Sequence, residues 1–283
     1  MMARVVLDGV GIEYELLGSE GAQAVALTPG GRFSMQAAGL KELGGLLADQ
    51  GFRVLLWDRP NCGKSDLHFE GPGESAMQAQ FLVKLIRTLD LGPTALWGGS
   101  AGARVSLLAA HADPQAISRL GLCWISGGLV SMMRLGSYYC CEPAEVAALQ
   151  GMEAVTQMPI WQEQIAASAR NRDYMLGFGR DAFIAKMEEW AWGFVPSRES
   201  PVGGLSREEL KALTMPAMVL RGSADDLYHP AWVCEQVAEL MPNARLVDPP
   251  WHLDIFADRM KDGTGLFSDW PMLAPLLDTF LRS

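Results

Sequence analysis

The sequence predicts an α/β fold: a doubly wound, mainly parallel eight-stranded sheet with an inserted helical cap. Short apolar runs alternate with segments of helical spacing up to residue 126, and the alternation resumes at residue 214. The stretch between, residues 127–213, lacks strand-like runs and is rich in methionine and aromatic residues. We therefore expect a core domain of residues 1–126 and 214–283, and a helical cap (lid) of residues 127–213.

The expected strands are short and apolar, as suits a sheet that is covered on both faces. Asp8-Gly9 predicts a tight turn between the first two. The eight strands are expected at residues 4–7, 12–17, 24–27, 52–57, 94–97, 118–125, 216–220 and 244–247. Helices are expected at residues 35–50, 75–91, 103–110, 231–241 and 269–281.

Composition narrows the class of protein. A chain of 283 residues with 49% hydrophobic residues can bury a sizeable core. Its net charge of −10, without a basic run, argues against nucleic acid and anionic membranes as partners. The odd number of cysteines predicts no disulfide framework, and no Cys/His spacing predicts a metal site. The sequence shows neither a signal peptide nor an 18-residue apolar run, so we expect a cytoplasmic protein.

One serine stands where a strand meets a helix. The apolar run from Thr94 ends in Gly98-Gly99-Ser100-Ala101-Gly102, and a strong helix former follows. A tight turn there would present the Ser100 hydroxyl as a nucleophile, and small neighbours would keep strand and helix apart. The helix N-terminus would also favour developing negative charge. The plainer alternative is a helix-start turn in which the serine only caps the helix.

A nucleophilic serine needs a base and an acid. His252 follows the last expected strand, and the order Ser100, Asp225 or Asp226, His252 predicts a catalytic triad with His252 as the base. His229, which precedes a proline beside the two aspartates, is the substitute base. Both aspartates follow a strand, and one of them can cap the next helix, so the residues alone leave the acid open.

Four motifs together resemble the α/β-hydrolase superfamily over nearly the whole chain. They are Pro29-Gly30-Gly31, the D-x-x-G-x-G-x-S-like loop from Asp58 to Ser65, the Gly98–Gly102 elbow and the loop from Gly222 to Pro230. The resemblance implies a serine hydrolase with a cap, whose oxyanion hole consists of the backbone N–H groups of Gly31 and Ala101. It also favours Asp226, because of that residue's spacing to Pro230. The family's base usually follows a glycine, whereas Trp251 precedes His252 here.

These observations predict hydrolysis of a small, fairly hydrophobic ester or lactone through an acyl-enzyme intermediate, without cofactor or metal. The expected substrate-binding residues are Arg32, Trp161, Trp190 and Trp251. Carbon–carbon bond hydrolysis of a diketone-type substrate stays open. So does a different class, a small-molecule binding protein on a hydrolase fold, which a His252 pointing away from Ser100 would favour. A small-molecule substrate is the expected partner, and a homodimer is left open.

Overall fold

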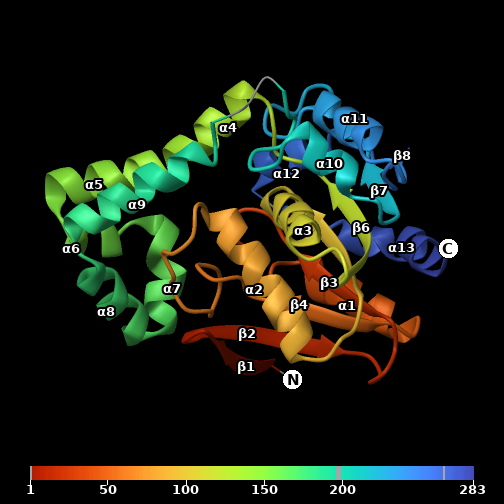
Figure 1. Ribbon diagram of the computed structural model, residues 1–283, viewed down its shortest axis with the longest axis horizontal. Coiled ribbons are helices and arrows are strands. Elements are labelled where there is room, and N and C mark those ends of the chain that lie inside the picture. The colour runs from red at the N-terminus through yellow and green to blue at the C-terminus, as the bar shows by residue number, and fades with distance from the viewer. Residues whose placement is uncertain (1, 196–198, 264) are drawn as a thin grey trace.

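An eight-stranded sheet with the order β1-β2-β4-β3-β5-β6-β7-β8 forms the centre of the computed structural model, which describes residues 2–195, 199–263 and 265–283 (Figure 1). β2 pairs antiparallel with β1 and β4, and the other neighbouring strands are parallel. The strands are β1 Met2–Leu7, β2 Val10–Leu17, β3 Ala24–Thr28, β4 Arg53–Trp57, β5 Thr94–Gly99, β6 Ile117–Cys123, β7 Ala217–Leu220 and β8 Ala244–Val247. The predicted fold class is confirmed. The Asp8-Gly9 turn has positive φ at both residues, as the tightest hairpins require.

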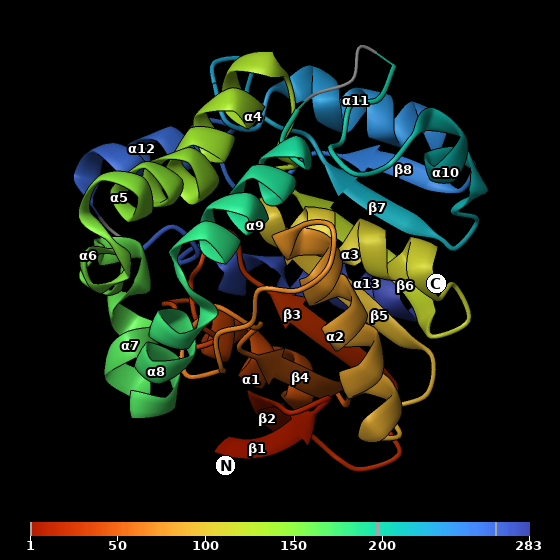
Figure 2. The same ribbon diagram turned by 60° about the vertical axis from the view of Figure 1, so that its left-hand side comes forward.

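Helices cover both faces of the sheet. α1 (Leu40–Asp49) and α13 (Ala274–Arg282) pack on one face, and α2 (Glu74–Thr88), α3 (Ala101–Ala112) and α11 (Ala231–Leu240) on the other. Figure 2 shows α2 and α3 in front of the sheet and α13 behind it. Side chains of each central strand alternate between the two layers, because successive residues of a strand point to opposite faces. On β4, for example, Val54 packs in the α1 layer and Leu55 in the α2 layer.

Two C-terminal elements differ from the prediction. The last helix begins with a 3-10 turn, η3 (Trp270–Leu273), in which Pro271 occupies the first turn. A further helix, α12 (Ile255–Asp262), follows β8 and was not predicted. It contributes to the candidate active site described below.

The described residues between β6 and β7 contain helices and no strand. These elements are α4 Leu129–Gly136, the π-helical turn η1 Ser137–Cys141, α5 Glu142–Gln150, α6 Met152–Thr156, the 3-10 turn η2 Pro159–Trp161, α7 Gln162–Ala167, α8 Ala169–Phe178, α9 Arg180–Trp192 and α10 Arg207–Ala212. α5 and α9 run side by side at the left of Figure 1, whereas α10 packs against α11 and α3. We call α4–α9, with η1 and η2, the cap helices. No helix within the described residues is long and apolar enough to cross a membrane.

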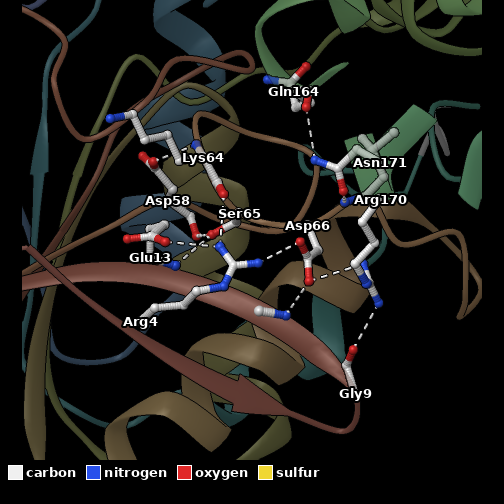
Figure 3. Close-up of polar contacts among 12 residues, drawn as sticks. Arg4, Gly9, Glu13, Asp58, Lys64, Ser65, Asp66, Gln164, Arg170 and Asn171 are labelled. Carbon is white, nitrogen blue, oxygen red and sulfur yellow. Dashed lines mark hydrogen bonds and ion pairs between the residues drawn. The ribbon is translucent and has the colours of Figure 1, made fainter. Parts of the chain in front are cut away.

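A buried carboxylate ties the cap helices to the core (Figure 3). Asp66 accepts hydrogen bonds of 2.6 Å from both Arg4 Nη2 on β1 and the Gly11 N–H on β2. Its other neighbour is Arg170 on α8, whose Nη1 lies 3.0 Å away and whose Nη2 donates to the Gly9 carbonyl. The loop after β4 thereby holds α8 against the β1–β2 hairpin.

Candidate active site

Ser100 occupies the turn between β5 and α3 with a backbone φ of 55°, a value that residues other than glycine rarely adopt. Close packing makes the flanking glycines necessary. A Cβ on Gly98 would lie 2.3 Å from the Gly102 carbonyl oxygen, and one on Gly102 would lie 2.1 Å from the Thr28 carbonyl oxygen. The Ser100 N–H donates to the Cys123 carbonyl at 3.1 Å. The predicted elbow is therefore present, at the carboxyl end of the sheet and the N-terminus of α3.

The Ser100 hydroxyl meets a histidine and an aspartate of the loop that joins β7 to α11. Ser100 Oγ lies 2.9 Å from His229 Nε2, and His229 Nδ1 lies 2.9 Å from Asp226 Oδ2. Asp226 Oδ1 also accepts the backbone N–H groups of Tyr228 and His229 at 2.8 and 3.0 Å. One carboxylate thus fixes both the turn and the imidazole. Both partners are buried.

The contact with His229 also sets the charge state of the acid. Burial by itself would raise the pKa of Asp226, but the hydrogen bonds and charge of His229 outweigh it, so the pKa lies below its ordinary value. Of the two aspartates left open by the residues, Asp226 is the one that reaches the imidazole. Asp225 is exposed to solvent, and its backbone N–H donates to Ser223 Oγ.

His252, the predicted base, does not lie at Ser100. Its side chain is 58% exposed, and its Nε2 lies 3.5 Å from Asp258 in α12. The reason is the path of the chain after β8, an edge strand: it turns into α12 and brings Phe256 over His229. The two rings meet edge to face, with centroids 4.5 Å apart. α12 therefore covers the imidazole through Phe256, and the substitute base His229 takes the position predicted for His252.

A second hydroxyl, that of Ser126, faces the nucleophile. Ser126 lies just beyond the end of β6, is buried, and its Oγ is 3.2 Å from Ser100 Oγ. Sequence reasoning missed this residue, although its place after a central strand, beside the end of β5, was a usable signal. When Ser100 donates its proton to His229 Nε2, the Ser126 hydroxyl is the group that can donate to Ser100 Oγ.

The loop after β3 is held by a buried arginine. Arg59 Nη2 donates to the carbonyl oxygens of Gly30 and Gly31 at 3.1 and 2.9 Å. In a trans peptide the C=O and the following N–H point in opposite directions, so this contact turns the Gly31 N–H away from Arg59. Gly30 passes so close to Ser100 that a Cβ on it would lie 2.7 Å from the serine Cβ. The Ala101 N–H is the first of α3 and takes no part in the helix ladder.

The Asp58–Ser65 loop supports the chain after β3 through the Asp58 carboxylate. Figure 3 shows Asp58 with Lys64 and Ser65. Asp58 accepts the backbone N–H groups of Met35 at 2.6 Å and Lys64 at 2.8 Å, and its carbonyl accepts the Ser65 hydroxyl at 2.6 Å. Gly63 has positive φ, and a Cβ there would lie 2.2 Å from the Asp58 carboxylate. Burial raises the pKa of Asp58 despite these hydrogen bonds. The motif acts as structural support and does not line the cavity at Ser100.

A cavity of about 320 Å³ opens at Ser100 and His229. Its apolar walls include Phe33, Trp124, Leu135, Phe256, Met260 and Phe267. Tyr138 and Tyr139, both in the π-helical turn η1, complete the cap side. Trp124 adopts a φ of 48°, a strained conformation of the kind that clusters at functional sites. Sequence reasoning missed the wall from α12, although the spacing of Phe256 and Met260 puts both on one helical face.

None of the four predicted substrate-binding residues lines this cavity. Trp161 and Trp190 are buried and pack edge-on against Phe69 in the core loop after β4, so these two residues pack the cap against the core. Trp251 packs behind the wall, on Trp124, with ring centroids 5.7 Å apart.

Arg32 lines a neighbouring cavity of about 410 Å³ instead. Its guanidinium donates to both carboxylate oxygens of Glu74, at 3.2 and 3.3 Å, and lies 3.7 Å above the Trp161 ring. The charge of Arg32 is therefore already compensated. Among the described residues, no cluster of three His, Cys, Asp or Glu side chains is placed to hold a metal ion.

Comparison with known proteins agrees with this architecture. Residues 37–138 match the family model of the alpha/beta hydrolase fold. The serine hydrolase BPHL of Homo sapiens is 25% identical over 260 residues, which cover 86% of this chain and 79% of that protein. The esterase RhEst1 from Rhodococcus sp. ECU1013 has 21% identity and a TM-score of 0.61, covering 100% of this chain and 98% of its own. The enol-lactonase from Burkholderia xenovorans LB400 has 18% identity and a TM-score of 0.61, covering 99% and 100%.

Proposed function

We propose that this chain is an α/β hydrolase that cleaves small carboxylic esters or lactones, with Ser100 as nucleophile, His229 as general base and Asp226 as the acid that orients it. The match of residues 37–138 to the alpha/beta hydrolase family model and the similarity to a serine hydrolase support the fold and the class. The observation that carries the proposal is the continuous line of hydrogen bonds from Ser100 Oγ through the His229 ring to Asp226. Such a line activates a hydroxyl, because the imidazole accepts the proton as the oxygen attacks.

The reaction would proceed in two halves. His229 Nε2 takes the Ser100 proton while Oγ attacks the carbonyl carbon, and the carbonyl oxygen becomes an oxyanion held by the N–H groups of Gly31 and Ala101. The protonated imidazole, stabilised by Asp226, then gives its proton to the leaving alkoxide, which departs and leaves an acyl-enzyme. Water, deprotonated by His229, attacks the acyl carbon and releases the acid and free Ser100.

The cavity supports the substrate class. A volume of about 320 Å³ with mostly aromatic and aliphatic walls suits a small, apolar acyl or alcohol group. The names of the compared proteins, an esterase, an enol-lactonase and a serine hydrolase, support ester and lactone chemistry without choosing between them.

Active-site labelling with a fluorophosphonate tests the assignment of nucleophile and base. We expect rapid labelling of the wild type, none for Ser100→Ala, and labelling slowed on the order of a thousandfold for His229→Ala. His252→Ala is the matched control and should label at the wild-type rate. Loss of labelling in His252→Ala with retention in His229→Ala would contradict the proposed base. Circular dichroism verifies that each variant is folded.

A substrate panel then tests the chemistry. p-Nitrophenyl esters of increasing acyl length and simple lactones should be hydrolysed, with a preference for short apolar groups. Cleavage of a 1,3-diketone by an enzyme inert toward every ester and lactone would instead favour carbon–carbon bond hydrolysis. The panel is run on Ser100→Ala in parallel, so that any background hydrolysis is subtracted.

A further inference from the structure

A separate cavity of about 230 Å³ lies where the N-terminus of α2 meets α3 and the end of α9. It shares no lining residue with the cavity at Ser100. We propose that this cavity binds a small tetrahedral oxyanion, of the size of inorganic phosphate, through Arg104 and the first backbone N–H groups of α2. We refer to it below as the Arg104 cavity.

Arg104 is a buried cation with no carboxylate of the described residues in direct contact, and the main negative charge that acts on it is that of Glu74, at longer range. The residue is 6% exposed, and within the described chain it forms no ion pair with a carboxylate. Its Nε donates to Ser75 Oγ at 3.0 Å, and its guanidinium lies 4.6 Å from the centre of the Phe194 ring. Nη1 is buried and has no hydrogen-bond partner among the described residues. A buried charged donor without a hydrogen-bond partner costs folding free energy, and an anion bound next to Arg104 would reduce that cost.

Arg104 is one of the residues that line the cavity. A Cβ built on Gly203 would lie 3.9 Å from Arg104 Nη1, and both residues line the Arg104 cavity. Glycine also occupies three other lining positions, Gly73, Gly193 and Gly204. These walls lack side chains, so an anion can approach the backbone closely. The volume is sufficient for a phosphate with one or two waters.

The N-terminus of α2 supplies a second, independent source of positive potential. α2 has 15 residues, and its N-cap residue Gly73 has extended backbone and provides no side-chain cap. The first N–H groups of a helix have no partner within it, and they carry the positive end of the helix dipole. Ser75 and Ala76, in this first turn, line the Arg104 cavity. Helix N–H groups together with an arginine form a typical oxyanion site.

One carboxylate also faces this region, that of Glu74. It is engaged elsewhere: Oε1 and Oε2 pair with Arg32, and Oε1 also accepts the Asn61 side-chain amide at 3.0 Å. Glu74 binds Arg32 directly and acts on Arg104 only at longer range, so these two arginines and one carboxylate leave one positive charge in excess. A bound oxyanion would neutralise the excess positive charge at Arg104. It would also link α9 and the chain after it to α2 and α3 of the core.

Calorimetric titration with sodium phosphate, sulfate or acetate, at constant ionic strength in chloride, tests the proposal without reference to hydrolytic activity. Wild type should bind phosphate or sulfate, and Arg104→Gln should bind at least about tenfold more weakly, the loss of one charge-assisted contact. Equal affinity in Arg104→Gln, no binding to wild type, or binding of acetate alone would overturn it.

A second variant keeps the test decisive if Arg104→Gln does not fold. Ala76→Asp places a carboxylate in the first turn of α2, where it suits the helix dipole but repels an anion in the cavity. We expect it to fold and to lose anion binding at least tenfold. Gln80→Glu adds the same charge on an exposed site of α2 and should bind as wild type does. Undiminished phosphate binding by Ala76→Asp would refute the site.

Discussion

At the scale of single residues, Ser100 Oγ has two polar neighbours with different tasks. His229 accepts its proton, while the buried hydroxyl of Ser126, 3.2 Å away, is placed to donate to the same oxygen. The second contact holds the Ser100 proton in the direction of the imidazole, because one lone pair of Oγ is then occupied. Ser126 is on this argument a positioning residue.

Replacing Ser126 tests that role. Ser126→Ala removes one neutral hydrogen bond, whose net value is about 1 kcal/mol, so kcat/KM should fall about fivefold. The pH profile should stay as in wild type, and the melting temperature should fall by no more than about 2–4 °C, because the same hydrogen bond also contributes to stability. Steady-state kinetics on a p-nitrophenyl ester measures the effect, and Ser126→Thr, which keeps the hydroxyl, should restore part of the rate. An unchanged kcat/KM would show that the contact between the Ser126 and Ser100 hydroxyls does not contribute to catalysis.

Arg59 allows a second test at this scale. Arg59→Lys keeps the charge but removes Nη2, which donates to the carbonyls of both Gly30 and Gly31, so the Gly31 N–H should lose its fixed direction. We expect kcat to fall about tenfold with KM little changed, since this donor acts mainly in the transition state. A KM increase at constant kcat would instead indicate substrate binding.

Residue identities predicted the nucleophile better than the base. The Gly98–Gly102 spacing predicts the Ser100 elbow because backbone oxygens leave no room for a Cβ at either glycine: the Gly102 oxygen in α3 faces Gly98, and the Thr28 oxygen at the end of β3 faces Gly102. The base depends on where a loop goes after its strand ends, and no local pattern records that. His229 precedes a helix-starting proline and lies three residues after Asp226, spacings that also fit an ordinary capped turn.

At the scale of elements, strands and covering helices could be predicted because each is locally periodic. The cap could be recognised as helical from its composition, but Trp161 and Trp190 could not be assigned from it, since aromatic residues fill a cap interior and line a cavity equally well. α12 escaped prediction because it is short and polar on most sides, and its apolar positions became meaningful only beside His229.

The attachment of α8 to the core gives a prediction about stability. Asp66→Ala removes the shared acceptor of Arg4, Arg170 and the Gly11 N–H, which leaves that N–H unpaired. The free energy of unfolding should fall by about 2 kcal/mol, as measured by urea denaturation. Arg172→Ala, which breaks an exposed ion pair of the same helix with Glu153, is the control and should cost less than about 0.5 kcal/mol. If both substitutions lowered the free energy of unfolding equally, Asp66 would not be the residue that links α8 to the core.

At the scale of the whole molecule, the acid of the site contributes to stability in a pH-dependent way. The folded state lowers the pKa of Asp226 below its ordinary value of 3.8, so ionised Asp226 stabilises the fold above that pH. This contribution is lost as the pH falls through the lower, folded-state pKa. The Asp226→Asn variant lacks this pH-dependent contribution. Its free energy of unfolding should therefore lie below that of wild type near neutral pH, and this difference should shrink below about pH 4. Denaturation curves between about pH 3 and 7 measure this; a constant deficit would contradict it.

The acid and the base lie three residues apart on one loop, and this separates two properties of the molecule. The hydrogen bonds that align them lie within the short 226–229 turn and do not involve the register of β8. The chain after β8 contributes packing: α12 places Phe256 on the imidazole and supplies cavity wall through Phe256 and Met260. Substitutions of Met260 can reshape the cavity while the line of hydrogen bonds for proton transfer stays intact. Selectivity in this enzyme can thus drift, or be engineered, independently of its rate.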